Sequence, residues 1–342
     1  MAGDPTGLPL RQRLTALTAV ILAESIGLWS CGTGGGPVAP PPVPPPTASA
    51  PTKPPVGLAT LTADPPLVAD ADAGSDAPAA SSMCPAGMVY VDTTYCPSVR
   101  LKCLKDEYSK ENHITICHKF APGQECLVQP RRQRYCIDKY EYPNQEGGHP
   151  PVMVDWYDGM AACKERGKRL CWESEWVSAC EGPEKLPFPY GRERDPKQCN
   201  IDNVWLIPEL EKIYSKDPAI AGAELLHLDQ SVRSGAKPGC VSGFGVHDLT
   251  GNFDEWVMSE EQRDEAKWAG LKGGAWGHVR NACRPKTMSH PPEFTYYFIS
   301  FRCCSDAGPL ASDDGGPAVW VPPPIHDKGK RGKISAGWTP GR

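Results

Sequence analysis

The pattern of apolar and polar positions predicts few strands, joined by long connections. Residues 87–91 alternate in character and carry β-branched side chains, which indicates a first strand. Further strands are expected at residues 272–276 and 298–303. Between residues 182 and 245 turn-forming residues dominate, and only one short helix is predicted there, near residues 208–214.

Two longer helices are marked by their ends. Asp155 can cap a helix, because Asp158 follows it at capping-box spacing, and Gly167 suits the C-terminal stop. The apolar face of this helix would carry Trp156, Met160 and Cys163. A second helix is predicted over residues 173–179, with Trp176 and Cys180 on its inner side.

The first 31 residues have the layout of an export signal. Arg11 and Arg13 precede an apolar run over residues 14–29, and the run ends at Leu28-Trp29-Ser30-Cys31. This arrangement predicts a bacterial lipoprotein, with Cys31 lipidated after cleavage and serving as the membrane anchor. An ordinary signal peptide with a chance cysteine is the alternative. The run is too short and too interrupted for a transmembrane helix.

The segments on either side of the central region are rich in small residues and proline. Residues 32–83 form a Pro/Ala-rich linker, in which Pro40-Pro41-Pro42-Val43-Pro44-Pro45-Pro46 favours an extended polyproline II conformation. Residues 307–342 form a tail rich in Pro, Gly and Lys. Neither segment has the apolar content of a core, so we predict that both are disordered and that the linker acts as a spacer.

Cysteine content separates this chain from cytosolic enzymes. The chain has 342 residues and 15 cysteines, with no Cys-x2-Cys pair of the kind that binds zinc. A disulfide framework is therefore expected, including a cysteine-rich insert at residues 96–134. The net charge of -5, without a long basic run, argues against nucleic acid as a partner.

Six motifs occur in a fixed order in the central region. The most informative is Gly245-Val246-His247-Asp248-Leu249-Thr250-Gly251-Asn252-Phe253-Asp254-Glu255-Trp256. The others are Tyr135-Cys136-Ile137-Asp138-Lys139-Tyr140-Glu141, Gly167-Lys168-Arg169-Leu170-Cys171-Trp172-Glu173-Ser174-Glu175-Trp176, Lys272-Gly273-Gly274-Ala275-Trp276, Arg280-Asn281-Ala282-Cys283-Arg284 and Phe301-Arg302-Cys303. In this order the set resembles the formylglycine-generating enzyme, or sulfatase-modifying factor, family. The resemblance implies a loop-rich, disulfide-stapled α+β domain of the C-type-lectin-like fold over residues 84–306.

The resemblance also implies particular disulfides. One family bridge joins the first helix to the final strand, which corresponds to Cys163 and Cys303 here. A second joins the cysteine after Glu-Trp to the Arg-rich strand, which corresponds to Cys180 and, with a shift of two residues, Cys283. Cys171 and Cys304 are then left near the same strands and are candidates for a further bridge.

The family binds calcium, and this chain has oxygen-bearing residues at the matching motifs. Calcium prefers six to eight oxygen ligands from carboxylates, amides and backbone carbonyls. The residues implied by the resemblance are Asn200, Ile201, Asp248, Gly251, Asn252, Asp254 and Glu255. A structural calcium site is thus expected, with a solvated acidic turn as the alternative.

The copper site of the family's enzymes is not evident. Those enzymes bind copper(I) with two cysteines five residues apart, downstream of a Gly-Gly-Ser-(Trp/Tyr) strand. Here residues 273–280 contain no cysteine, and Cys283 is the nearest thiol. Copper is therefore an unlikely cofactor for this chain. Related domains also occur in an iron-dependent sulfoxide synthase, which makes His278 and His290 weak candidates as metal ligands, but no carboxylate partner is obvious.

A binding groove is the remaining candidate. Aromatic and arginine side chains flank the strand that lines the family's substrate groove, namely Trp276, His278, Arg280, Arg284, Tyr296 and Tyr297. The alternative is that Trp276 lies in the core and Arg280 pairs with Glu173 or Glu175. We favour a non-catalytic binding or structural module for a protein, peptide or glycan, exported as a lipoprotein of the bacterial envelope, periplasmic or surface-exposed. The alternative is an oxidase or non-haem iron or copper enzyme that uses Cys283, His278 or His290.

Overall fold

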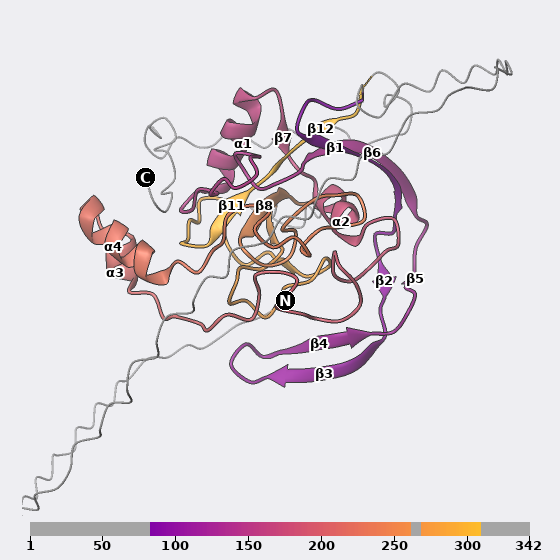
Figure 1. Cartoon of the computed structure of the whole chain (residues 1–342), viewed down its shortest axis with the longest axis horizontal. Helices are drawn as coiled ribbons and strands as arrows, with labels where there is room; N and C mark the ends of the chain where they lie inside the picture. The colour runs from indigo at the N-terminus through magenta and orange to yellow at the C-terminus, as the bar shows by residue number, and fades with distance from the viewer. Residues whose placement is uncertain (1–82, 261–267, 309–342) are drawn as a thin grey trace, which may run out of the picture. The chain divides into compact units, whose positions relative to one another are not determined.

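The structure is a computed structural model that describes residues 83–260 and 268–308. The predicted signal peptide with Cys31, the linker up to residue 82 and the tail from residue 309 lie outside these residues. The described part is an α+β domain with short strands and long loops, as expected (Figure 1).

The first sheet has four strands in the order β1-β6-β12-β7, each antiparallel to its neighbour. They are β1 (Met88–Tyr95), β6 (Arg131–Asp138), β7 (Arg169–Leu170) and β12 (Cys303–Asp306). Tyr135, Ile137 and Val91 are buried on the face that meets Trp176. The predicted strand at residues 87–91 is thus the beginning of the longer β1.

The second sheet has the order β10-β9-β8-β11, with β8 and β11 parallel. Its strands are β8 (Asp254–Met258), β9 (Ala269–Lys272), β10 (Lys286–Thr287) and β11 (Ile299–Phe301). The predicted single strand at residues 298–303 is wrong, because the chain passes from β11 in this sheet to β12 in the other at Arg302. The strand predicted at residues 272–276 ends at Lys272 instead, since Gly273 and Gly274 have φ angles of 93° and 68°.

Two helices pack against these sheets (Figure 1). In α1 (Trp156–Glu165), Asp155 accepts from the Asp158 N–H and Asp158 returns the bond, which confirms the capping box. Helix α2 (Glu173–Glu181) is two residues longer than predicted, and Trp176 and Cys180 are fully buried. The main core lies between α1 and the second sheet and includes Trp156, Phe253, Trp256 and Phe301.

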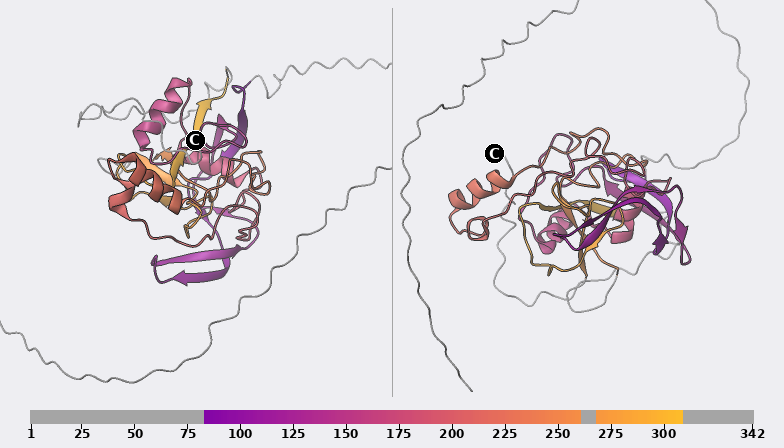
Figure 2. Two further views of the ribbon diagram at one scale, coloured as in Figure 1. Left: turned by 60° about the vertical axis from the view of Figure 1, so that its left-hand side comes forward. Right: turned by 90° about the horizontal axis from the view of Figure 1, so that it is seen from below.

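A helical pair occupies one edge of the domain, as Figures 1 and 2 show. Helix α3 (Leu210–Ile213) falls within the predicted short helix. Helix α4 (Pro218–Leu228) was not predicted. Its signals were present, because Asp217 accepts from the Ala219 N–H as the cap and Pro218 occupies the first turn, where its missing N–H costs nothing.

The cysteine-rich insert contains two small antiparallel pairs. Strands β3 (Cys103–Ser109) and β4 (Ile114–Phe120) form a hairpin, and β2 (Val99–Arg100) pairs with β5 (Glu125–Cys126). Figure 1 shows the hairpin at the periphery of the domain. Disulfides hold both pairs, because Cys103 is bonded to Cys117 and Cys96 to Cys126.

Seven disulfides staple the described residues. Those from the resemblance, Cys163–Cys303 and Cys180–Cys283, are both present, as is Cys171–Cys304. The others are Cys84–Cys136, Cys96–Cys126, Cys103–Cys117 and Cys199–Cys240. This density of disulfides indicates an oxidising, extracellular location. Within the described residues, no helix is both long and apolar enough to span a bilayer.

Candidate ligand-binding site

A tight turn after β9 sets the geometry of the candidate site. Asn281 is fully buried, and its Nδ2 donates to the carbonyl oxygens of Gly274 and Ala275, each at 2.9 Å. A Cβ on Gly274 would lie 3.0 Å from that nitrogen, so the turn requires glycine. The sequence analysis assigned no function to Asn281, although Asn281 belongs to the Arg-Asn-Ala-Cys-Arg motif.

Beyond this turn, aromatic rings form a connected row, which we call the aromatic row. It consists of Trp205, Trp276, His278, His290, Phe294, Tyr296, Tyr297 and Phe298. Trp205 stacks on His278 with ring centroids 5.9 Å apart, and His290 stacks on Phe294 at 4.0 Å. Ring contacts from Phe294 to Tyr296 and from Tyr296 to Phe298 connect the two ends.

The row is partly core and partly surface. Its buried members are Trp276, Tyr297 and Phe298. Trp276 therefore lies in the core, as the alternative to a groove residue predicted. Trp205 is 45% exposed. His278, His290, Phe294 and Tyr296 are intermediate. Trp205 was not among the predicted groove residues, because it lies far from the strand in sequence and reaches it only through the loop at residues 202–206.

His278 has a carboxylate neighbour that the sequence did not suggest. Its Nδ1 lies 3.5 Å from an Asp254 oxygen, while the other Asp254 oxygen accepts from the Gly274 N–H at 3.0 Å. Burial raises the pKa of Asp254 to about 7. Burial, followed by the nearby Arg280 charge, lowers the pKa of His278 to about 4. Both effects favour the neutral imidazole of His278, which is stacked on Trp205 and makes an edge-to-face contact with Phe298.

Cys283, the nearest thiol in the sequence, is not a thiol in the structure. Its sulfur is bonded to Cys180, with the two Cα atoms 5.5 Å apart. All fourteen cysteines of the described residues are in disulfides. Cys283 therefore holds the Arg-rich segment against α2 and is not a copper ligand.

The residues expected to bind calcium are divided among separate contacts. Asn252 Oδ1 accepts from the Val232 N–H at 2.9 Å and from Asn200 Nδ2 at 3.2 Å, and Gly251 lies tightly against Ile201. The Asn200 and Asn252 loops are thus joined by amide hydrogen bonds.

The expected carboxylates point elsewhere. Glu255 is bonded to Arg302 through both oxygens, and Asp248 accepts from the Gly235 N–H at 2.7 Å. Within residues 83–260 and 268–308, no three His, Cys, Asp or Glu side chains are placed to share an ion. The amide oxygens of Asn200 and Asn252 and the Glu255 carboxylate already accept from protein donors, which argues against an oxygen cage built from these three side chains. Calcium binding by this chain stays a prediction.

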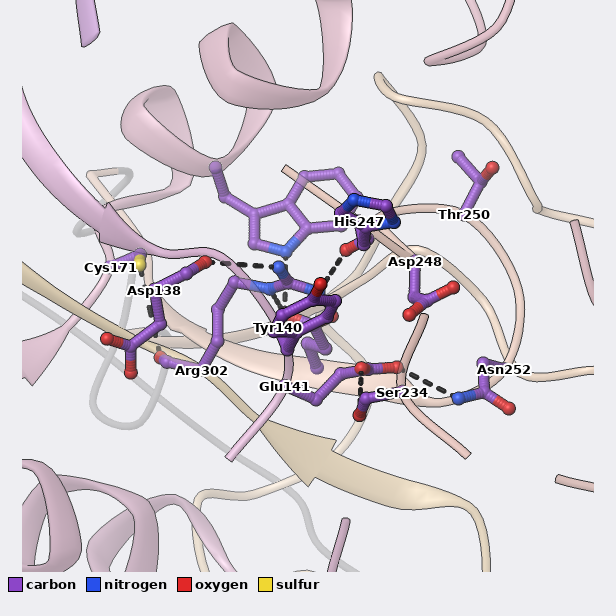
Figure 3. A network of polar contacts seen from close by, with 12 residues as sticks. Asp138, Tyr140, Glu141, Cys171, Ser234, His247, Asp248, Thr250, Asn252 and Arg302 are labelled. Carbon is purple, nitrogen blue, oxygen red and sulfur yellow. Dashed lines mark hydrogen bonds and ion pairs between the residues drawn. The ribbon is translucent and has the colours of Figure 1, made fainter. Parts of the chain in front are cut away.

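A buried acidic network surrounds Arg302 (Figure 3). Glu141 accepts from Ser234 Oγ at 2.8 Å and from Asn252 Nδ2 at 2.9 Å. Burial first, and then repulsion by Asp248, raises the pKa of Glu141 to about 8. Burial likewise raises the pKa of Asp248 to about 6. The network joins loops that are far apart in sequence and has the character of a structural core.

The arginines of the predicted groove are also structural. Arg284 pairs with Glu181 at 2.5 Å, and Arg280 donates to Thr287 Oγ1 at 2.6 Å. The expected ion pair of Arg280 with Glu173 or Glu175 is wrong, because other basic residues take those carboxylates. Glu173 pairs with Lys286 and Glu175 with Arg169.

The described domain resembles a known protein family in sequence. Residues 107–307 match the model of the sulfatase-modifying factor enzyme 1-like domain. The chain is 32% identical over 166 residues to the bovine (Bos taurus) inactive C-alpha-formylglycine-generating enzyme 2, covering 46% of this chain and 51% of the relative. It is 25% identical over 181 residues to the mouse (Mus musculus) formylglycine-generating enzyme, covering 48% and 46%.

The chain spans about half the length of these curated relatives. Among solved structures, PvdO from Pseudomonas aeruginosa matches with 15% identity and a TM-score of 0.38, covering 64% of this chain and 94% of that one. This likeness is too low to carry an argument. The family match extends over more than half of the chain, and the chain therefore belongs to the sulfatase-modifying factor family.

Proposed function

We propose that this chain is an exported, non-catalytic binding module whose ligand lies on the aromatic row. The observation that carries the proposal is the disulfide between Cys180 and Cys283. Copper(I) chemistry in this family needs two thiolates within reach of each other, and a bridged cysteine supplies none. The similarity to a relative named inactive supports the same conclusion.

The aromatic row supports a ligand with flat or apolar faces. Trp205 is exposed and is backed by His278, Tyr297 and Phe298, so its ring is held in place before a ligand arrives. Rigid aromatic side chains provide much of the affinity at binding surfaces because little entropy is lost when they make contact. A peptide or a glycan that stacks on these rings is the ligand class we propose.

Anchorage at the cell envelope is part of the proposal. The seven disulfides require export, and the signal-like segment ending at Cys31 would supply both export and a lipid. The linker between Cys31 and the domain would then set the distance of the binding surface from the membrane.

The proposal is tested by probing the full chain with glycan and peptide arrays and then measuring affinity for any retained probe. Trp205→Ala should weaken binding by at least about tenfold, which is the effect of losing one aromatic anchor. Tyr108→Ala is the matched control, because Tyr108 is also exposed but lies on the β3–β4 hairpin. Equal affinity of both variants, or chemical turnover of the retained probe, would contradict the proposal.

A further inference from the structure

The helical pair α3–α4 and the loop that precedes it, residues 204–207, carry an exposed apolar surface, which we call the α3–α4 face. Ile207 is 83% exposed, Val204 76% and Leu226 60%. The face also includes Leu210, Tyr214 and Ile220. So many large exposed apolar side chains within one segment are unusual for a surface in contact with water only.

The outer side of helix α4 is mainly apolar, and His227 is its exposed polar side chain. Glu224 is the helix's only carboxylate, and this side chain is buried and accepts from the Glu209 N–H at 3.0 Å. Leu225 and Leu228 pack into the main core, while Ile220 and Leu226 face outward. A helix with large apolar side chains on both its inner and its outer side is normally covered on both.

The face is firmly attached to the domain. Tyr214 donates its hydroxyl proton to the Thr295 carbonyl at 2.7 Å, and Gln230 Nε2 donates to the Val204 carbonyl at 2.9 Å. Thr295 lies between Phe294 and Tyr296, so the face adjoins the aromatic row. These bonds fix the face as a preformed surface rather than a loosely held loop.

The chain itself contains a segment with matching chemistry. Residues 318–325 read Ala-Val-Trp-Val-Pro-Pro-Pro-Ile, and four basic residues and one acidic residue follow by residue 333. Residues 202–229, which include the α3–α4 face, carry six carboxylates and two lysines. An apolar segment followed by basic residues thus complements an apolar surface flanked by acidic ones.

The other proline-rich segment has the wrong charge. Residues 32–82 carry four aspartates and one lysine, so they would be repelled by the same carboxylates.

The tail is also long enough to reach the α3–α4 face. Nine residues lie between Gly308 and Ala318, and the ten extended Cα–Cα steps from one to the other span about 35 Å, which is about twice the radius of gyration of a domain of this size.

We propose that residues 318–333 dock on the α3–α4 face, with Trp320 and the three prolines on the apolar side chains and the basic residues beside Glu209, Glu211 and Asp217. The inference is independent of the ligand on the aromatic row, because it concerns a contact within one chain. A tethered segment is presented at a millimolar effective concentration, so an intrinsic affinity near 0.1 mM suffices for about 90% occupancy.

The test is hydrogen exchange of the α4 amides in the full chain and in two full-chain variants. Trp320→Ser should speed α4 exchange by about tenfold, because the docked fraction falls from about 90%. Trp338→Ser is the matched control, since it also removes a tail tryptophan but lies outside the proposed segment. A synthetic peptide of residues 318–333, added to the Trp320→Ser variant, should restore the slow exchange near millimolar concentration.

Equal α4 exchange in the full chain and in both variants would overturn the proposal. Protection that is lost when the full chain is diluted would also overturn it, because a second copy would then be the occupant. The same holds for protection that appears only when lipid vesicles are added, since the face would then dock on a membrane. In each case loss of aromatic-row binding in Trp205→Ala is measured separately, so the two proposals fail independently.

Discussion

Arg302 and Glu255 form a bidentate ion pair in which each side chain is only 1% exposed. Arg302 Nε and Nη2 donate to the two Glu255 oxygens, each at 2.7 Å, and Trp176 Nε1 donates to the same carboxylate at 2.9 Å. Arg302 lies where the chain crosses from one sheet to the other, and Glu255 lies on β8. The pair therefore ties the two sheets and α2 together at one point.

Removing Arg302 should be strongly destabilising. Arg302→Met leaves the Glu255 carboxylate buried without its counter-charge, and we expect a loss of about 3–5 kcal/mol in the free energy of unfolding. Arg100→Ala is the control, because its pair with Glu125 is exposed and is expected to contribute about 0–1 kcal/mol. Urea unfolding measures both, and a loss below about 1 kcal/mol for Arg302→Met would refute the structural role of the pair.

Glu141 should make the domain more stable in mild acid than in mild base. Its pKa is about 8 in the folded chain against an ordinary value of 4.5, so the folded state binds more protons between these values. Stability contributed by the protonated group is therefore lost as pH rises through this window. Glu141→Gln should flatten the decline by up to about 1.4 kcal/mol per pH unit. Unfolding measured from pH 5 to 8 checks this, with exposed Glu125→Gln as control, and an unchanged slope in Glu141→Gln would count against it.

The disulfides should differ in their contribution to stability. Cys163–Cys303 closes a separation of 140 residues and both sulfurs are buried, whereas Cys103–Cys117 closes 14 residues in the hairpin. The Cys171–Cys304 disulfide already joins the same two segments, so Cys163–Cys303 closes a loop of only about ten residues, and loop-closure entropy gives about 3 kcal/mol for either disulfide. Removal of the two buried sulfurs also leaves a cavity in the core, so double Cys→Ala variants, compared by denaturant unfolding under oxidising conditions, should lose more stability at Cys163–Cys303 than at the partly exposed Cys103–Cys117. The reverse order would show that the hairpin disulfide does more than close a local loop.

Calcium should have little effect on stability. The amides of Asn200 and Asn252 bond to each other and to backbone groups, and Arg302 neutralises Glu255. Thermal unfolding in calcium and in a chelator should therefore give nearly the same midpoint. A site loaded at one hundred times its Kd would instead stabilise the fold by about 2.7 kcal/mol, and a shift of that size would restore the calcium expectation.

Local signals predicted the elements whose ends are set by neighbouring residues. The Asp155 capping box and the position of Trp176 in α2 were correct for this reason. Strand boundaries near the site were not, because they depend on distant contacts. Asn281 fixes the Gly273–Gly274 turn through carbonyl oxygens, and Arg302 divides β11 from β12 by bonding to Glu255 on another strand.

In the candidate site, too, some residues could be predicted from their neighbours in sequence, whereas others depend on contacts between distant segments. His278 and Tyr296 were selected by their place beside one strand, and the structure places both in the aromatic row. Trp205 and the Asp254 neighbour of His278 come from other segments, and no spacing in the sequence relates them. The expected calcium residues were grouped by motif, but their side chains turn to different partners.

The most direct test of the central claim is the thiol content of the folded chain. Intact mass is measured after alkylation, first without reductant and then with it, on the domain recovered from an oxidising compartment. We predict that none of the fourteen cysteines from Cys84 to Cys304 is alkylated before reduction, and that all are alkylated afterwards. Two or more alkylated thiols before reduction, mapped to Cys283 and a neighbouring cysteine, would contradict the proposal of a non-catalytic module. That result would favour a copper enzyme instead.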